Sequence, residues 1–582
     1  MISAAVVAAA VSFVPATAQA APAAGPGRAS TANSPALAAG SAQGATAPDA
    51  TAQAAAAQEA GKAADAAARQ TAREAAAQDV AAKAAKAKAA RAAAPKATAE
   101  SDASAPAQQS SFFDVGMGTI ARYAHTIGLA TSVATDLPDS YAQYDVDWGD
   151  GTVVRDIGKS SEFMYFDHKY AEVGTHTITI KATDVMSRVT SVTTKDVVVD
   201  GSEFTPHAPT RLLDTRDGTG TAAAGQVAPY GTARVKVTGN SGIPAGVTAV
   251  ALNITATNTS AGGHITAYAS GKAAPTTSNV NFATGQTVPN LAIVPVGEDG
   301  YVELANRSEG AVDLLADVTG YFTRSAAAGY TSVKPSRLVD TREGLGAARG
   351  QVAAQSTFDV RIAGQGGLPA AGVTAVALNV TATDPKGAGH LTVFPSGQQA
   401  PTTSSLNFTA GQTVANAVIV PVGPDGRISI RNGAWDPADV IVDVTGYYSA
   451  DGKAAYLPEE PRRLYDSRPY RLSLAGQDYY HQTVWTSGMA LEALVLNATV
   501  TNTQGGGYLS VAADPNTIDD YIGGKAVRPT PPDSSVLNWT KDATVANLVQ
   551  AGTGSTAVID FWNRGWQPTD LIVDLFGMYD KN

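Results

Sequence analysis

The stretch Val250-Ala251-Leu252-Asn253-Ile254-Thr255-Ala256-Thr257 gives the clearest indication of the fold class. Side chains along a β-strand point alternately to its two faces, so residues 250, 252 and 254 form an apolar face and residues 253, 255 and 257 a polar one. The same alternation recurs at residues 376–383 and 494–501. Because Gly, Pro and Asn punctuate the sequence at short intervals and no amphipathic helical window appears beside these stretches, the pattern predicts all-β modules.

These strands lie in three copies of one repeat. Each copy opens with Arg-Leu-x-Asp-Thr/Ser-Arg, at residues 211–216, 337–342 and 463–468, and closes with Asp-x-x-Gly, at residues 317–320, 443–446 and 574–577. Three asparagines recur between these ends: Asn253, Asn281 and Asn290, then Asn379, Asn407 and Asn416, then Asn497, Asn538 and Asn547. A repeat of this length is a whole domain. We therefore expect three separate beads at residues 202–324, 325–450 and 451–582, each a β-sandwich or small barrel with its own core.

Two further patterns concern individual strands. Residues 440–444 are apolar on both faces, which predicts a central rather than an edge strand. Residues 175–182 alternate as in a half-buried strand, and Trp148-Gly149-Asp150-Gly151 provides a turn that closes a hairpin after the strand at 144–147. Residues 111–201 are thus predicted to form a fourth compact β-domain.

Both kinds of domain resemble known families. The turn at 148–151, followed by His168-x-Tyr170 and Gly174, resembles the polycystic kidney disease (PKD) domain, although Thr175 stands where that family often has an aromatic residue. The resemblance implies an immunoglobulin-like β-sandwich of the kind found in bacterial surface proteins and secreted hydrolases. The three copies resemble a tandem repeat near the C-termini of exported proteins of high-GC Gram-positive bacteria, which implies export but no particular activity.

The first 110 residues are predicted to contain a processing signal and a linker that precede these domains. Residues 1–20 contain no charged side chain and end in Ala18-Gln19-Ala20, the pattern of a signal-peptidase site, so we expect a signal peptide. Residues 21–110 are rich in Ala, which favours helix, but they offer no stripe of large apolar residues to bury. We favour a partly helical or disordered, solvated linker. The alternative is a stalk that crosses a cell envelope.

The composition of the 582 residues excludes several classes of function. With 41 Lys and Arg against 52 Asp and Glu, the formal net charge is −11, which argues against nucleic-acid or anionic-membrane binding. The chain has no Cys, which excludes disulfides, thiolate metal sites and a Cys nucleophile. No segment after the predicted signal peptide is long and apolar enough to span a membrane.

The charged residues of the opening and closing motifs are predicted to form a structural clasp. Asp317, Asp443 and Asp574 stand within apolar strands, where a carboxylate must be paired to be tolerated, and arginine is a bidentate partner. We hypothesise that an opening Arg meets the closing Asp in each module; the alternative is that these groups grip a carboxylate or sugar hydroxyl of a ligand. The residues concerned are Arg211, Asp214, Arg216 and Asp317; Arg337, Asp340, Arg342 and Asp443; and Arg463, Asp466, Arg468 and Asp574.

Catalytic and metal motifs are absent from the sequence. The seven His residues include no pair at metal-ligand spacing, so we predict a protein that is not an enzyme. Asp145, Asp147 and Asp150 lie close in sequence and are candidates for calcium. We favour the alternative that aspartates cap the turn by accepting backbone hydrogen bonds. No other cofactor is indicated.

The third module differs from the others in its aromatic residues. Four of the six Trp (Trp485, Trp539, Trp562 and Trp566) lie there, together with an insertion around residues 515–532. Trp562 and Trp566, beside Asn563 and Arg564 in a loop flanked by Gly and Pro, are the candidate ligand-binding residues. Aromatic faces suit sugar rings, and nearby polar groups can meet the hydroxyls. The alternative, which we favour, is core packing, since Trp is highly buried on average.

We therefore expect an exported, non-enzymatic binding or adhesion protein that is extracellular or associated with the cell wall. Its expected partner is an extracellular glycan, a cell-envelope polymer or a surface protein. Two alternatives remain open: a secreted hydrolase with an unrecognised catalytic module, and a purely structural component of the envelope or spore coat.

Overall fold

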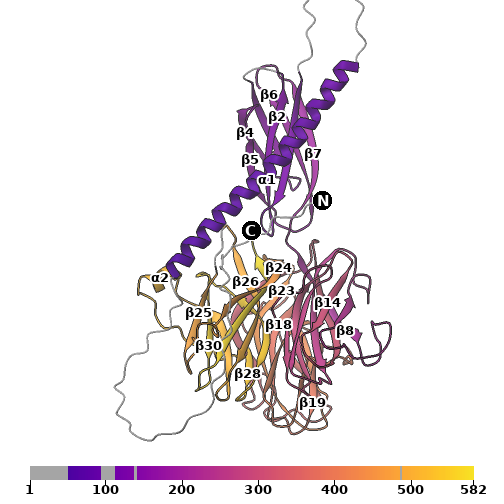
Figure 1. Ribbon diagram of the computed structural model, residues 1–582, viewed down its shortest axis with the longest axis vertical. Helices are drawn as coiled ribbons and strands as arrows, with labels where there is room; N and C mark the ends of the chain where they lie inside the picture. Colours follow the sequence, from indigo (N-terminus) through magenta and orange to yellow (C-terminus); the bar gives the residue numbers. More distant parts are fainter. Residues whose placement is uncertain (1–49, 94–111, 137–139, 485–487) are drawn as a thin grey trace, which may run out of the picture.

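The computed structural model describes residues 50–93, 112–136, 140–484 and 488–582 (Figure 1). Its strands form eight antiparallel sheets, so the predicted all-β sandwich fold is confirmed. The predicted signal peptide, residues 21–49 and 94–110 of the predicted linker, residue 111 and Trp485 lie outside the described residues.

The first seven strands form what we call the N-terminal sandwich. They are β1 (Phe113–Ala121), β2 (Thr126–Thr135), β3 (Tyr141–Asp147), β4 (Val153–Lys159), β5 (Met164–Lys169), β6 (Thr175–Asp184) and β7 (Thr190–Val198). Sheet β1-β2-β5 packs against sheet β4-β3-β6-β7 around a core that contains the buried Trp148. The predicted hairpin is confirmed, because β3 pairs with β4 and the Trp148 N–H donates to the Thr152 carbonyl at 3.0 Å.

The remaining strands form three modules with the same topology. Module 1 contains β8 (Glu203–Asp214), β9 (Thr232–Lys236), β10 (Val247–Thr257), β11 (Gly263–Ala269), β12 (Val280–Phe282), β13 (Val288–Pro295), β14 (Tyr301–Asn306) and β15 (Asp313–Thr323). Module 2 contains β16 (Gly329–Asp340), β17 (Thr357–Arg361), β18 (Val373–Thr383), β19 (Gly389–Pro395), β20 (Leu406–Phe408), β21 (Val414–Pro421), β22 (Arg427–Asn432) and β23 (Asp439–Ser449). Module 3 contains β24 (Ala455–Asp466), β25 (Tyr479–Thr483), β26 (Leu491–Thr501), β27 (Gly507–Ala513), α2 (Ile518–Ile522), β28 (Leu537–Trp539), β29 (Val545–Gly552), β30 (Val558–Asn563) and β31 (Asp570–Asp580).

Each module is a sandwich of an inner and an outer four-stranded sheet. The inner sheets have the orders β13-β10-β15-β8, β16-β23-β18-β21 and β24-β31-β26-β29, and the outer sheets contain the other strands. The apolar residues at 250, 252 and 254 lie in the core of module 1, as their alternation predicts. Residues 440–444 belong to β23, which lies between β16 and β18, so the predicted central strand is confirmed.

The three modules are not the separate beads that the repeat predicts. Besides the core inside each module, they share a fourth core at their common centre. Seven buried aromatic residues, at least two from each module, meet there: Phe204, Phe322, Tyr330, Tyr448, Tyr456, Phe576 and Tyr579. The starts of the modules also pair in a cycle, with bridges from 204 to 328, from 330 to 454 and from 456 to 202. The three modules of this single chain therefore form one assembly with a threefold arrangement, which we call the three-module body.

The recurring asparagines close this cycle with hydrogen bonds from module to module. The Asn416 amide of module 2 donates to the Asn253 side chain of module 1 at 2.9 Å, and the Leu291 N–H of module 1 donates to the Asn416 Oδ1 at 3.2 Å. The same two bonds recur at the other two junctions, with Asn547, Asn379 and Ala417 and then with Asn290, Asn497 and Leu548. The polar faces of the inner strands are thus buried against neighbouring copies.

Helix α1 (Ala50–Ala93) packs along the outer face of strands β1 and β2 of the N-terminal sandwich (Figure 1). Ala72 and Ala76 are buried in this contact. A Cβ atom added to Gly118 of β1 would lie only 1.9 Å from the Ala72 carbonyl oxygen, so the glycine allows the two backbones to approach closely. The expectation of a solvated linker is therefore wrong for this helix. Small residues on both sides bury surface without a stripe of large apolar side chains.

Candidate functional site

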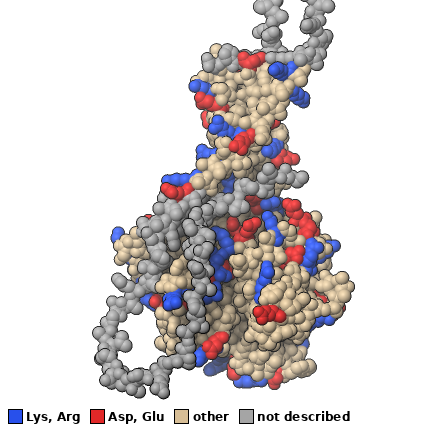
Figure 2. Space-filling view, viewed as in Figure 1, with Lys and Arg blue, Asp and Glu red and all other residues tan. Residues whose placement is uncertain are grey.

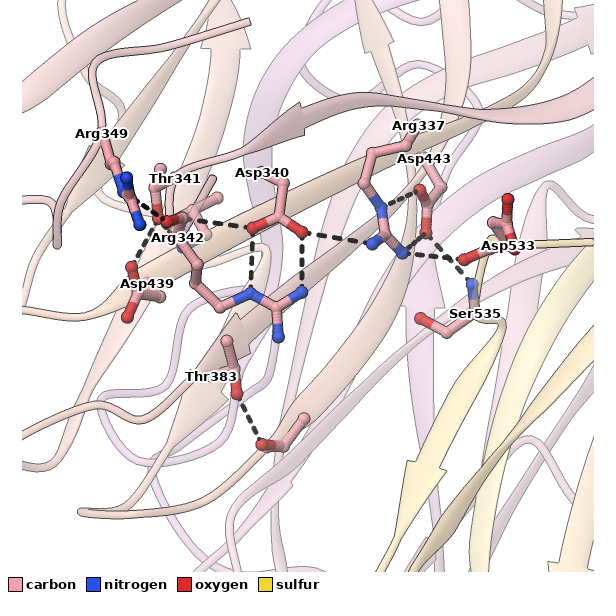
Figure 3. Close-up of polar contacts among 12 residues, drawn as sticks. Arg337, Asp340, Thr341, Arg342, Arg349, Thr383, Asp439, Asp443, Asp533 and Ser535 are labelled. Atoms are coloured by element: carbon pink, nitrogen blue, oxygen red, sulfur yellow. Dashed lines mark hydrogen bonds and ion pairs between the residues drawn. The ribbon is translucent and has the colours of Figure 1, made fainter. Parts of the chain in front are cut away.

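The expected ion pair between the opening Arg and the closing Asp is present in every module. The Arg Nε lies 2.8 Å from Asp317 Oδ1 in module 1, and 2.9 Å from the closing carboxylate in modules 2 and 3. The same arginine donates to the opening Asp, which also receives two bonds from the second opening Arg. In module 2 this gives a chain of alternating charges from Arg342 through Asp340 and Arg337 to Asp443 (Figure 3).

The two carboxylates in this row of alternating charges have pKa values that are shifted in opposite directions. Hydrogen bonds from Arg342 lower the pKa of Asp340, whereas burial raises the pKa of Asp443 in spite of the ion pair with Arg337. The clasp of module 2 also reaches module 3, because the Ser535 N–H donates to Asp443 and the Arg337 guanidinium donates to the Asp533 carbonyl (Figure 3). These groups therefore join the two ends of a module to each other and to the next copy, and their hydrogen-bonding capacity is largely taken up within the protein.

The candidate calcium ligands of the N-terminal sandwich bind the protein itself. Asp147 accepts from the Gly149 N–H and Asp150 accepts from the Thr152 N–H, each at 2.9 Å, as expected of turn caps. Asp150 also pairs with His168, and Asp145 pairs with Arg155. Within the described parts of the chain, no group of three or more His, Asp or Glu side chains is placed to hold a metal ion.

Two of the candidate ligand-binding residues in module 3 are buried, so they do not form an exposed platform, and for Trp562 the favoured alternative of burial applies. Trp562 is only 2% exposed; its ring stacks on Tyr479 at a centroid distance of 4.6 Å, and the Arg528 guanidinium lies 5.1 Å from its centroid. Arg528 belongs to the insertion, which covers this outer-sheet position. The Asn563 amide donates to the Leu474 and Gln567 carbonyls and so holds its loop in shape.

The other two candidates have different surroundings. The Arg564 guanidinium lies 5.8 Å from the centroid of Tyr508, within the range of a cation–π contact. Trp566 is 82% exposed, in the loop between β30 and β31. Sequence inspection missed its counterpart Trp435, which is 83% exposed in the equivalent loop between β22 and β23. Aligning the loops on the recurring Asn432 and Asn563 would have revealed it, because each Trp follows that Asn by three positions.

The N-terminal sandwich lies at one end of the three-module body, and we call the opposite end the distal end (Figure 1). Strand β31 ends at Asp580, whose carboxylate accepts from the Ala124 N–H of the N-terminal sandwich. At about 3.3 Å per residue, a strand of this length spans roughly 35 Å. Its first residue and the preceding loop therefore lie at the opposite end, and the cyclic pairing of the module starts gives the loop of Trp435 the same orientation.

A pair of buried carboxyl groups is a second feature that the sequence did not indicate. Asp514 and Asp560, 2% and 1% exposed, lie within hydrogen-bonding reach of each other beneath the insertion. Tyr521 of α2 donates to Asp514 and stacks on His481 at a centroid distance of 3.8 Å. Burial, and then the neighbouring Asp514, raise the pKa of Asp560 to about 9. The carboxyl groups of glycosidases instead flank a substrate cleft at separations of about 5 Å or more.

The raised pKa of Asp560 predicts how the stability of the protein depends on pH. The pKa of Asp560 is higher in the folded protein than the value of about 3.9 expected in the unfolded chain. Between these two pKa values the folded state keeps a proton that the unfolded state has lost. The free energy of unfolding therefore falls as pH rises from about 3.9 toward 9. Asp560→Asn removes this loss. We expect thermal unfolding to show a higher melting temperature for the variant at pH 8 and little difference near pH 4. An equal shift at both pH values would contradict the assignment.

No protein-family model matches the chain, and no curated protein matches it. Among solved structures, a SusE-like protein matches at 11% identity with a TM-score of 0.12, covering 35% of this chain and 96% of its own. A structure of Sulfolobus turreted icosahedral virus matches at 11% identity and a TM-score of 0.15, covering 65% of this chain and 91% of its own. A tetra-tandem repeat from the extending region of a large adhesion protein matches at 13% identity and a TM-score of 0.13, covering 81% of this chain and 99% of its own. At such TM-scores these likenesses carry no argument about function.

Proposed function

We propose that the protein is an exported, multi-domain binding protein that attaches to polysaccharide at the cell surface or in the cell envelope without catalysis. In this proposal the N-terminal sandwich is a PKD domain, and the three modules are copies of the repeat of exported proteins that they resemble. No helix in the described residues is long and apolar enough to cross a membrane.

One observation carries the proposal: two indole side chains stand almost fully exposed on equivalent distal loops. Trp435 and Trp566 are 83% and 82% exposed, whereas Trp148 and Trp562 are buried. Exposed aromatic residues at a repeated position point to a binding role, since their faces can pack on the C–H faces of sugar rings. Asp436 and Gln567 follow them directly and are also exposed, so that each loop adds a hydrogen-bond acceptor for hydroxyls.

The surface charge agrees with an uncharged ligand. Lys and Arg are interspersed with Asp and Glu over a surface that is mostly uncharged (Figure 2). The net charge of −11 disfavours association with a polyanion, because like charges repel.

Retention on insoluble polysaccharide tests the proposal. The full chain is incubated with purified cell walls, chitin and β-glucan, and the bound fraction is compared between wild type, Trp435→Ala, Trp566→Ala and the double variant. We expect the double variant to lose at least about tenfold in affinity, which corresponds to about 1.4 kcal/mol. Tyr141→Ala, an exposed aromatic change on the N-terminal sandwich, is the matched control and should bind as wild type.

The outcomes separate the rival functions. Unchanged retention of the double variant would overturn the assignment of the two tryptophans. Retention by no polysaccharide at all would favour a purely structural protein. A secreted hydrolase would release soluble sugar from the polysaccharide, whereas a binding protein without catalysis would release none.

A further inference from the structure

Module 1 has an exposed aromatic residue at the same corner, although it has no tryptophan there. Glu309 stands at the position of Trp435 and Trp566 in its loop, and the exposed aromatic residue is Tyr230, at 63%. The Asn306 amide donates both to the Ala228 carbonyl, at 3.0 Å, and to the Gly310 carbonyl, at 2.8 Å. This side chain holds the turn of Tyr230 directly beside the loop of Glu309.

The counterparts of Tyr230 confirm that it occupies the same corner. They are Gln355 and Gln477, which share its positive φ, and whose side-chain amides donate to Gly433 and Gly565 in the two tryptophan loops. In modules 2 and 3 this turn therefore supports the loop that carries the aromatic residue. In module 1 the turn itself carries the aromatic residue, and the loop carries the acidic Glu309.

The assembly places all three corners at one end. The modules share one strand topology, and their first strands pair in a closed cycle at the end near the N-terminal sandwich. The corners are formed by the loops that precede β15, β23 and β31, the strands that run back toward that end. The distal end therefore presents Tyr230 with Glu309, Trp435 with Asp436, and Trp566 with Gln567 around the centre of the body.

We infer that these three corners act together as one trivalent face that binds the surface of an uncharged, repeating polysaccharide, with Tyr230 as the third contact. The inference rests on the proposed function and adds to it the valence and the class of ligand. Two of the three aromatic residues have an acidic neighbour, Glu309 or Asp436, which would repel an anionic polymer while accepting hydrogen bonds from neutral hydroxyls.

Three sites on one rigid body should bind a polymer more tightly than one site does. Once one corner is bound, the others meet further repeats of the same polymer at a high effective concentration, so affinity for a polymer exceeds that for a single site by about 10²–10⁴. A short oligosaccharide occupies one corner only and gains nothing from the others. The difference between polymer and oligosaccharide therefore measures valence.

The experiment uses the full chain with two probes of the same chemistry, insoluble β-glucan or chitin and the corresponding soluble tetrasaccharide. We expect Tyr230→Ala to weaken retention on the polymer about tenfold or more, since one corner of three is lost, and to leave titration of the tetrasaccharide at the two tryptophan corners unchanged. Tyr141→Ala is the control for a lost exposed tyrosine. Alginate, a polyanion, should not retain the wild type.

Each other outcome overturns a specific claim. If Tyr230→Ala binds the polymer as tightly as wild type while Trp435→Ala with Trp566→Ala does not, the trivalent face is wrong and the proposed function stands. If Tyr230→Ala weakens tetrasaccharide binding as much as polymer binding, the corners are one site rather than three. Retention on alginate equal to that on the neutral polymers overturns the uncharged ligand. If neither the polymers nor the tetrasaccharide bind wild type, this inference and the proposed function fail together.

Discussion

Asn416→Leu is expected to destabilise the three-module body by about 3–9 kcal/mol, because it leaves three polar groups without partners at about 1–3 kcal/mol each. Asn416 is 1% exposed. Its amide donates to Asn253 Oδ1 and to the Ser405 carbonyl, and its Oδ1 accepts from the Leu291 N–H. Leucine has a similar shape and can satisfy none of them. Chemical unfolding, followed by tryptophan fluorescence, measures the loss.

Asn281→Ala is the matched control, since Asn281 is another recurring asparagine of the repeat. Its Oδ1 has no hydrogen-bond partner among the residues described, so its removal should cost less than about 1 kcal/mol. If both substitutions cost the same, the ring of bonds between modules does not stabilise the body. The comparison also distinguishes two asparagines that recur equally in the repeat but differ in their hydrogen bonds.

The role of these asparagines shows where sequence reasoning stops. Strand alternation correctly placed Asn253, Asn379 and Asn497 opposite the apolar faces of their strands, because strand periodicity is a local property. Their partners lie in other modules, however: Asn253 of module 1 bonds with the Ser404 carbonyl of module 2. No local pattern records which surface of one copy meets another. The prediction of separate beads failed for this reason.

The same limit applies to the candidate site. Trp562 and Trp566 are close in sequence and equally apolar, yet one is buried and the other exposed. The difference comes from Arg528 and its insertion, which folds back over the outer sheet at Trp562. Trp435 is the single Trp of its module, so no cluster of Trp marks it, and only its equivalence to Trp566 in the repeat does.

The three-module arrangement follows from the interface between copies. Each copy contacts the next through one surface and the previous one through another, which is a heterologous interface that forms a ring when the rotation closes. Here the ring closes at three, since module 3 returns to module 1 through the Leu548 N–H and Asn290. Covalent linkage of the copies then allows them to diverge, and the insertion of module 3 and the Tyr230 corner of module 1 are such differences.

Arg337→Met is expected to cost about 3–5 kcal/mol, because removing one partner of a buried ion pair leaves a charge without compensation. The side chain of Asp443 is fully buried, and Arg337 is the cation that neutralises it. The pKa of Asp443 is already raised by burial, and it should rise further in the variant. Thermal and urea unfolding measure the loss of stability.

Two companion variants decide whether this is a clasp or a ligand-gripping site. Arg342→Met removes a side chain that is 46% exposed, while Asp340 keeps Arg337 as its partner, so it should cost about 1 kcal/mol or less. Arg337→Met with Asp443→Asn removes both charges and keeps an acceptor for the Ser535 N–H, so the double variant should regain a large part of the lost stability. A structural clasp requires this order. If Arg337→Met instead left stability unchanged and weakened polysaccharide retention, the arginine would belong to a binding site, because a group held for a ligand stabilises the complex rather than the free protein.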